Sequence, residues 1–258
     1  MALASEAPEI VNIDGQAINI ASQDDLIGRM QCRMRNGHGF SVFTLNLDHL
    51  VKRRADENFR AIYARATFVT ADGVPLLGLA RKQGKTVGLA TGADLIDPLC
   101  AMAARAGLPL YFYGSTQANL EGAAAELAKR HPGLIIAGCE APPFGLKPRS
   151  PEVEAAGERM AKAGAKICLV ALGAPRQEQV SDFLFEKHPG IGFLCIGAAL
   201  DFVSGGQVRA PVAFRKAGVE WLWRLGANPR RMFMRYLRCA VLLRDLARQT
   251  GPHTPYPG

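Results

Sequence analysis

The sequence alternates between short apolar runs, rich in β-branched or aromatic residues, and longer stretches in which apolar residues recur at helical spacing. The short runs predict strands at residues 40–45, 67–70, 110–113, 134–137, 167–171 and 193–196. Helical stretches separate these strands, and a short hairpin around Asp14 and Gly15 precedes a first helix that Ser22 caps. The alternation predicts an α/β fold with a Rossmann-like parallel sheet.

After Gly197 the pattern changes to helices alone, predicted at about residues 211–225 and 229–247. On a helical wheel, the second helix gathers its apolar residues on one face: Met232, Phe233, Tyr236, Ala240, Leu243 and Ala247. Another face carries Arg231, Arg235 and Arg238. Such a helix suits a membrane interface, and it equally suits a packing helix whose basic face is solvated.

The positive charge of the chain is concentrated in this C-terminal part. The 258 residues, enough for one large domain or two small ones, carry a formal net charge of +8. From Arg209 onward, ten basic residues stand against only Glu220 and Asp245. This distribution favours a polyanionic partner. Nucleic acid, an anionic membrane surface and a phosphorylated substrate are the alternatives.

The six cysteines lack the spacing of a metal or redox site. They contain no C-x-x-C pair, and most lie inside apolar runs, which is typical of buried free thiols in a reducing compartment. The N-terminus lacks a secretory signal, and no apolar run approaches the ~18 residues of a membrane span. We therefore expect a cytoplasmic protein.

One carboxylate follows a predicted strand directly. Residues 67–70 are β-branched or aromatic, and Asp72 comes next within the sequence Ala-Asp-Gly. Ligands of parallel α/β sheets collect at the carboxyl ends of the strands, so Asp72 is a candidate catalytic residue. The alternative is structural, with Asp72 capping the next helix or forming an Asx turn with Gly73.

Three further segments follow predicted strands. Gly114 and Ser115 occupy a strand-to-helix turn, where small residues let a phosphate approach the helix amides, although any tight α/β turn also uses them. Gln177 offers a donor and an acceptor to a sugar or a base, unless it only caps backbone amides. Asp201 is either a ligand or a turn carboxylate that pairs with Arg209.

Taken together, segments in order along the chain resemble the WecG/TagA/CpsF family of bacterial glycosyltransferases (glycosyltransferase family 26). They are T-L-N at 44–46, A-D-G at 71–73, T-G-A-D-L at 91–95, Y-G-S at 113–115, G-A-P-R-Q-E at 173–178, G-A-A-L-D-F at 197–202, R-A-P at 209–211, V-E-W-L-W-R-L at 219–225 and N-P-R-R at 228–231. Each segment alone is weak, but the ordered set covers nearly the whole chain and is specific.

The resemblance implies transfer of a sugar from a UDP-sugar to a sugar on an undecaprenyl-diphosphate carrier, with inversion and without a bound metal or other cofactor. It also implies a Rossmann-like core at residues 1–205 and a basic, helical, membrane-associating appendage at residues 206–250, followed by a disordered tail at 251–258. The enzyme would then act at the inner face of the plasma membrane. Homo-oligomers are expected as well.

The resemblance assigns roles residue by residue. Asp72 resembles the general base, and Thr44 and Asn46 would line the acceptor pocket beside it. The donor site would include Gly114, Ser115, Gln177 and Asp201. Arginines would reach the diphosphate of the donor or the carrier, namely Arg209, Arg215, Arg224 and Arg231. A carboxylate that removes the acceptor proton and cations that stabilise the departing diphosphate are what inversion needs.

Two positions depart from the family pattern. Leu89 stands where the family often has an arginine, and Val180 replaces a common tryptophan. The reaction class is unaffected, but the donor sugar is left open between glucose and N-acetylmannosamine. The Arg-rich and Ala-rich composition is typical of a bacterium with a GC-rich genome, and on this ground an exopolysaccharide is favoured as the product.

Two other functions fit parts of the sequence. A nicotinamide-dependent oxidoreductase would use the same doubly wound core, but the chain lacks the glycine fingerprint and the acidic residue that follows it. A nucleic-acid-binding protein would use the basic tail and would bind with steeply salt-dependent affinity. The resemblance favours the glycosyltransferase, with a UDP-sugar and a lipid-linked acceptor as partners and no nucleic acid.

Overall fold

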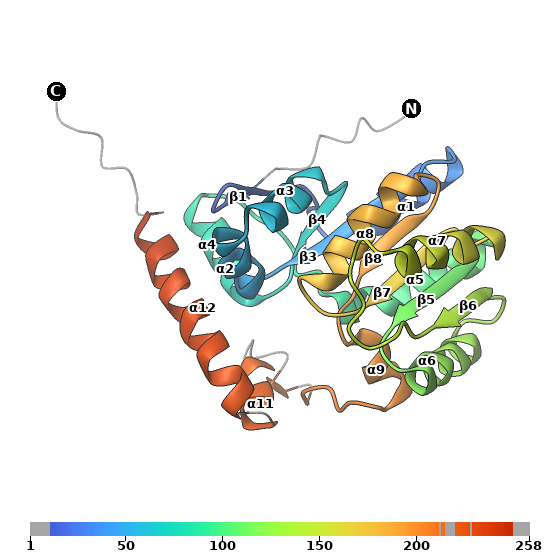
Figure 1. Ribbon diagram of the computed structural model, residues 1–258. Coiled ribbons are helices and arrows are strands. Elements are labelled where there is room, and N and C mark those ends of the chain that lie inside the picture. Colours follow the sequence, from blue (N-terminus) through green and yellow to red (C-terminus); the bar gives the residue numbers. More distant parts are fainter. Residues whose placement is uncertain (1–10, 212, 215–219, 228, 250–258) are drawn as a thin grey trace.

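The computed structural model describes residues 11–211, 213–214, 220–227 and 229–249. At its centre is a six-stranded sheet of order β4-β3-β8-β7-β5-β6, in which all neighbouring strands are parallel (Figure 1). The strands are β3 (Phe40–Leu45), β4 (Phe68–Ala71), β5 (Leu110–Gly114), β6 (Ile136–Glu140), β7 (Ile167–Ala171) and β8 (Gly192–Cys195). The predicted α/β, Rossmann-like fold is confirmed.

Helices connect the strands, and a hairpin of β1 (Val11–Ile13) and β2 (Gln16–Ile18) precedes them. The helices are α1 (Gln23–Arg35), α2 (Leu47–Ala55), α3 (Glu57–Arg65), α4 (Val74–Lys82), α5 (Gly92–Ala106), α6 (Gln117–Arg130), α7 (Pro151–Lys162), α8 (Arg176–Lys187), α9 (Ala199–Ser204), α11 (Glu220–Ala227) and α12 (Pro229–Gln249). The predicted cap of the first helix is confirmed, because Ser22 Oγ accepts the N–H of Asp25 at 3.1 Å.

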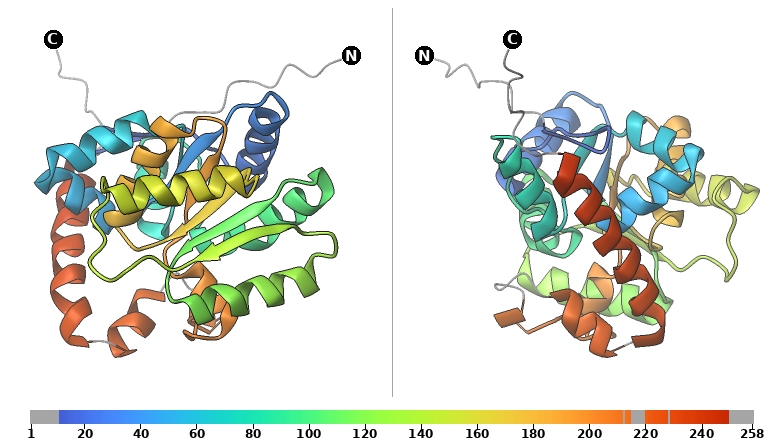
Figure 2. Two further views of the ribbon diagram at one scale, coloured as in Figure 1. Left: turned by 45° about the vertical axis from the view of Figure 1, so that its right-hand side comes forward. Right: turned by 90° about the vertical axis from the view of Figure 1, so that its left-hand side faces the viewer.

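Side chains of the strands alternate between the two faces of the sheet, and helices cover both faces (Figure 2). Leu110 and Phe112 of β5 join a buried cluster with α1, α5, α6 and α9. Tyr111 and Tyr113 face the other side and pack with α7 and α8, while a cluster around Phe43 joins β3 and β4 to α2, α3 and α4. Parallel strands are usually buried on both faces in this way.

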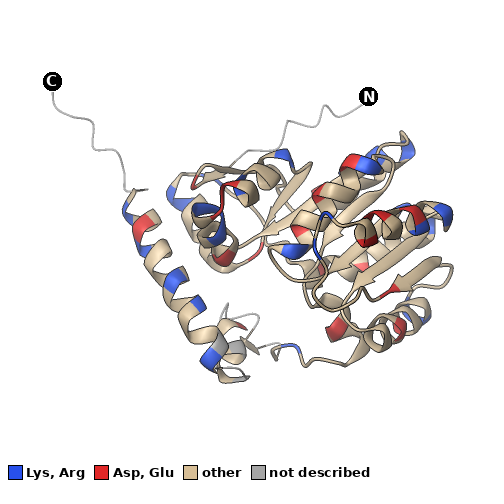
Figure 3. Ribbon diagram, viewed as in Figure 1, with Lys and Arg blue, Asp and Glu red and all other residues tan. Residues whose placement is uncertain are grey.

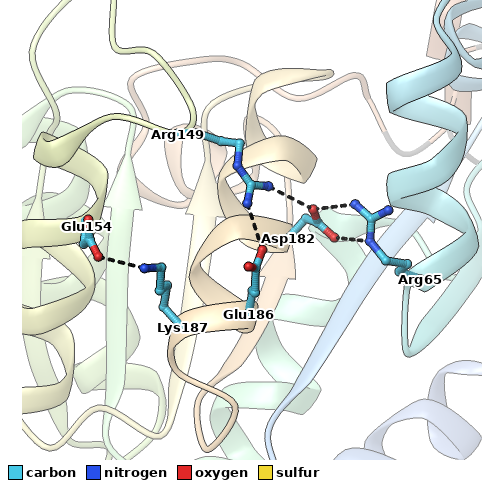
Figure 4. Close-up of polar contacts among 6 residues, drawn as sticks. All are labelled: Arg65, Arg149, Glu154, Asp182, Glu186 and Lys187. Atoms are coloured by element: carbon cyan, nitrogen blue, oxygen red, sulfur yellow. Dashed lines mark hydrogen bonds and ion pairs between the residues drawn. The ribbon is translucent and has the colours of Figure 1, made fainter.

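Ion pairs tie α8 to its neighbours (Figure 4). Asp182 of α8 accepts hydrogen bonds from Nε and Nη2 of Arg65, at the end of α3, at 3.1 and 2.8 Å. Arg149 pairs with Glu186 at 2.8 Å, and its guanidinium lies 4.8 Å from the ring centroid of Phe183. Exposed ion pairs contribute little one by one, but contacts on two sides restrict rotation of α8 about its own axis.

The last helix, α12, lies outside these layers and packs along α2 and α4 (Figure 1, Figure 2). Of its described side chains, Cys239, Leu242 and Leu246 are buried. Leu242 and Leu246 join the cluster that contains Leu50 of α2 and Leu79 of α4. The C-terminal helix is therefore anchored to the core by a short apolar stripe.

Two ion pairs orient α12 on α2. Arg235 Nη2 lies 3.1 Å from Asp48 Oδ2, and Arg54 Nη1 lies 2.8 Å from Asp245 Oδ2. The buried face consequently differs from the apolar face of the helical wheel: Phe233 is 59% exposed, whereas Arg235, predicted on the basic face, contacts α2. The wheel treats one helix alone and lacks the charges of α2 that select its orientation.

Two other predictions need correction, and one helix was not predicted. β6 begins at Ile136, two residues later than predicted, because the residues before it form a turn in which the N–H of Leu134 donates to the His131 carbonyl at 3.0 Å. A helix that was not predicted, α9, follows β8. All six cysteines are free, but Cys32 is exposed and Cys139 is half-buried.

Some predictions fall on residues outside the described ranges. These are the disordered tail at 251–258, the phosphate-binding role of Arg215, and the middle of the helix predicted at 211–225. Among the helices that the structure describes, none has both the length and the apolarity to cross a lipid bilayer.

Candidate active site

The sequence candidates gather at one edge of the sheet, where its parallel strands end. Asp72 follows β4, Asn46 follows β3, Ser115 follows β5, and Gln177 lies in the helix after β7. β5 leads to β6, whereas its neighbour β7 leads to β8, so the chain leaves these two strands in opposite directions. Ligands of open α/β sheets bind at such a switch point.

The neighbouring strand holds Asp72 in place. The N–H of Asp72 donates to the Leu45 carbonyl at 2.7 Å, and Asn46 Nδ2 donates to Asp72 Oδ2 at 3.3 Å. Asn46 is also the N-cap of α2, where its Oδ1 accepts the N–H of His49 at 3.2 Å. A single amide therefore orients both the start of α2 and the half-buried Asp72 carboxylate.

Gly73 separates Asp72 from the helix that follows. It is the N-cap residue of α4. Gly73 has a φ of +129°, a conformation that other residues rarely adopt, so it turns the chain sharply after Asp72. Thr44, the predicted neighbour in the acceptor pocket, is buried and stands opposite Thr70 in the sheet.

Asp201 gathers three polar side chains in the other half of the edge. Its Oδ1 accepts hydrogen bonds from Ser115 Oγ and, at 3.0 Å, from Asn119 Nδ2, while its Oδ2 accepts from Gln207 Nε2 at 2.8 Å. The predicted alternative, an ion pair with Arg209, is wrong, because Asp201 lies in the first turn of α9 and Arg209 pairs elsewhere. Asp201 is therefore the centre of a polar cluster.

Close backbone packing positions Ser115 for this cluster. Gly114 has a φ of +127°, and a β-carbon at this position would lie 2.3 Å from the Ala171 carbonyl oxygen. Ser115 follows with a φ of +43°, and its N–H donates to the same carbonyl at 2.8 Å. The turn requires glycine at position 114 and directs the Ser115 hydroxyl towards α9.

Arg209 forms an ion pair with the start of α5. Its Nη2 lies 2.6 Å from Asp94 Oδ1, and Thr91 Oγ1 donates to Asp94 Oδ2 at 2.7 Å. A β-carbon on Gly92 would lie 2.8 Å from the Ile196 carbonyl oxygen, so the start of α5 lies against the end of β8. One of the predicted diphosphate-binding arginines is thus held at the same edge of the sheet.

Gln177 and its neighbour Glu178 lie beneath the edge. Gln177 is 3% exposed, and both ends of its amide bind protein atoms: Oε1 accepts the N–H of Gly197 at 3.0 Å, and Nε2 donates to Glu178 Oε1 at 2.8 Å. Glu178 is fully buried, and burial raises its pKa to about 7. The sequence placed Glu178 near the start of a helix and predicted no site role for it.

A buried polar pair supports α2. His49 Nδ1 lies 2.9 Å from the Tyr63 hydroxyl, and burial lowers the pKa of His49 to about 3, so the ring is neutral at neutral pH. Asp48 beside it stays ionised: burial raises its pKa, but Arg235 and Lys52 together outweigh burial and lower it below the usual value. The start of α2 therefore carries a negative charge that α12 neutralises in part.

The site residues form two groups. One contains Asp72 and Asn46 at the ends of β4 and β3, and the other contains Ser115 and Asp201. β8 and β7 lie between β3 and β5, which places those strands three spacings, or ~14 Å, apart. Gln177, in the helix that follows β7, lies between the groups in strand order, and its amide bonds to Gly197 and Glu178.

The structure gives the side-chain position of one of the four predicted diphosphate-binding arginines. Arg209 lies at the edge of the sheet, whereas Arg224 belongs to α11 and Arg231 to α12, and their side chains are outside what the structure describes. Within the described part of the chain, no three His, Cys, Asp or Glu side chains gather in a way that could hold a metal ion.

A comparison with models of protein families matches residues 11–254 to the glycosyl transferase family WecG/TagA/CpsF. The chain belongs to this family. The match includes the sheet, both groups of site residues and α12. Membership in the WecG/TagA/CpsF family supports a glycosyltransferase role, which implies a nucleotide-sugar donor and an acceptor, and it favours this role over an oxidoreductase or a nucleic-acid-binding protein.

The structure adds residues that sequence reasoning did not assign to the site. Asp94 lies within T-G-A-D-L, which carried part of the family resemblance, and Asn119 stands one helical turn after Ser115, so both had a signal. Gln207 had none, since no pattern in the sequence links it to Asp201.

Proposed function

We propose that this WecG/TagA/CpsF glycosyltransferase moves a hexosyl group from a UDP-sugar to the sugar of an undecaprenyl-diphosphate-linked acceptor. Transfer inverts the anomeric carbon and needs no bound metal. The Asp72 carboxylate carries the proposal, because Asn46 orients it at the ends of two adjacent strands in a member of this family. The donor is of the UDP-glucose or UDP-N-acetylmannosamine type, and the product is an exopolysaccharide or another cell-surface polysaccharide.

Asp72 acts as the general base. Its carboxylate takes the proton of the attacking acceptor hydroxyl, the hydroxyl oxygen bonds to the anomeric carbon, and the bond from that carbon to the diphosphate oxygen breaks. UDP leaves with the electron pair of the broken bond. Thr44 and Asn46 line the acceptor side, where the hydrogen bond from Asn46 keeps the carboxylate aligned. A positioned base of this kind contributes roughly 10²–10⁴-fold to the rate.

The donor binds across the edge towards the Asp201 cluster. Gly114, Ser115 and Asp201 form the polar end of this path, Gln177 borders it, and the ~14 Å between the two groups suits an extended nucleotide sugar. The Arg209 guanidinium, which pairs with Asp94 at this edge, would leave Asp94 and bind the diphosphate of the donor instead. A guanidinium binds such a group bidentately. Arg215, Arg224 and Arg231 add further positive charge from the appendage.

The appendage brings the enzyme to its lipid-linked acceptor. Exposed apolar side chains gather on α11 and α12, namely Trp221, Leu222, Trp223, Phe233, Met234, Leu237 and Val241. Arginine positions are spaced along the same helix, α12 (Figure 3). An apolar face flanked by arginines favours binding to an anionic membrane surface, which for this acceptor is the inner face of the plasma membrane.

Calorimetric titration with UDP, with and without magnesium, tests the proposal. We expect UDP to bind equally well in both conditions, and a panel of UDP-sugars with a lipid-diphosphate acceptor then identifies the donor. Titration with NADH is the control for the oxidoreductase alternative. The proposal is wrong if UDP fails to bind both in solution and in the presence of anionic vesicles.

A further inference from the structure

Glu178 is a buried acid that the proposed reaction does not use. It stands at the start of α8 and is fully buried, and its Oε2 has no hydrogen-bond partner among the described residues. Acidic side chains are rarely buried without a partner, because desolvation is costly for the charged form. Its other oxygen, Oε1, accepts a hydrogen bond from Gln177.

Gln177 links Glu178 to the turn that follows β8. The N–H of Gly197 can only donate, so the amide oxygen of Gln177 must face Gly197 and the amide nitrogen must face Glu178. Gly197 has a φ of +58° and lies between β8 and α9, the helix that carries Asp201. The amide therefore ties the start of α8 to the turn that places Asp201.

We propose that Glu178 is a positioning residue of the donor site: by holding the Gln177 amide, it fixes the Gly197 turn and, through α9, the Asp201 cluster. This inference rests on the donor role proposed for that cluster. Asp182 lies one turn further along the same side of α8, and its hydrogen bonds with Arg65 restrict the rotation of the helix and so the direction in which Glu178 points.

Burial favours the neutral form of Glu178. Tyr63 of α3 and Cys195 of β8 lie near Glu178, and burial raises the pKa of both well above their usual values, so both are neutral. The hydrogen bond from Gln177 and the charge of Lys52 lower the pKa of Glu178, the charge of Asp48 raises it, and burial outweighs them. Above pH about 7 the carboxylate becomes charged with no partner for Oε2, which favours its movement towards water and release of the amide.

Two substitutions separate positioning from simple packing. Glu178→Gln keeps an acceptor for the Gln177 amide and cannot ionise, whereas Glu178→Leu fills the same space without an acceptor. We expect the affinity of the wild-type protein for UDP to fall between pH 6 and pH 8. The affinity of Glu178→Gln should stay constant over this range. Glu178→Leu should bind UDP about tenfold more weakly than the wild type at pH 6, both at pH 6 and at pH 8. Glu57→Gln, at an exposed position of α3, is the matched control and should behave as the wild type.

Hydrogen exchange of the Gly197 amide provides a second measurement that needs no ligand. Glu178→Leu should raise the exchange rate of the Gly197 amide about tenfold, because the Gln177 oxygen that accepts its hydrogen bond is no longer held in place, and Glu178→Gln should not.

The inference is overturned if the wild type binds UDP while Glu178→Leu binds UDP equally well with unchanged exchange at Gly197. If Glu178→Leu does not fold, an identical pH profile for the wild type and Glu178→Gln overturns it. Failure of the wild type itself to bind UDP contradicts the proposed function, and the exchange rates still decide whether Glu178 fixes the turn.

Discussion

The edge of the sheet and the helix α12 both combine arginines, carboxylates and apolar side chains, but they are held in different ways. At the edge, Asp201 accepts from three side chains, and Gln177 uses both ends of its amide within the core. α12 is anchored by a short apolar stripe and exposed ion pairs, and it leaves Phe233 and Val241 in solvent. From this difference we expect that the core holds the edge residues rigidly, whereas α12 detaches more readily than the sheet unfolds.

The largest expected effect concerns the rigid region. Asp72→Asn should lower turnover by about a thousandfold, because it removes the base but keeps the shape of the side chain, and UDP affinity should be unchanged. Steady-state kinetics and calorimetry measure both quantities. Asp24→Asn, at an exposed position of α1, is the control. Near-normal turnover would return Asp72 to the role of a turn residue.

Core and appendage should differ in their response to the same truncation. Leu169→Ala, in β7, should lower the free energy of unfolding by roughly 3 kcal/mol, since it leaves a cavity in close packing. Leu242→Ala, in α12, should cost about 1 kcal/mol, because the helix can shift or detach without unfolding the sheet. Urea denaturation measures the loss of unfolding free energy in each variant. Equal losses would mean that α12 is an integral part of the core.

Glu178 should make the stability of the core depend on pH. Its pKa rises from the usual 4.5 to about 7 on folding, so the folded state binds the proton more tightly than the unfolded state. Stability should therefore fall by roughly 3 kcal/mol as the pH rises from 4.5 through 7, and should level off above that. Denaturation of Glu178→Gln across this range should lack this part of the decline; an unchanged slope would refute the assignment.

Membrane binding should depend on the appendage alone. The double substitution Phe233→Ser and Leu237→Ser should lower partitioning onto anionic vesicles at least about tenfold, because two exposed apolar side chains no longer enter the interface. Vesicle sedimentation measures this, and the unfolding free energy should hardly change. Ile135→Ser, an exposed apolar position before β6, is the control. Equal loss in the control would indicate non-specific adsorption.

The smallest effect is expected where the two regions meet. Arg235→Gln removes the ion pair with Asp48 and should cost less than about 1 kcal/mol of stability, since the pair is partly exposed. Hydrogen exchange in α12 should nevertheless increase, and exchange in the sheet should not. Increased exchange throughout the sheet would show that the docking of α12 supports the core.

The sequence alone determined the parts of this protein that depend on local patterns. Hydrophobic periodicity placed all six strands of the sheet, with β6 shifted by two residues, and strand-end positions nominated Asp72, Ser115, Gln177 and Asp201. The ordered motifs identified the family. Periodicity and turn chemistry act over a few residues, so they can be read without a structure.

Only the tertiary structure decided which distant residues meet. It paired Arg209 with Asp94 instead of Asp201, turned Arg235 towards α2, and buried Glu178 beneath the edge. Such contacts join residues that are far apart in the chain, or depend on the face that a helix presents to its neighbours. Their strength comes from burial and from the charges of other elements, which no local pattern contains.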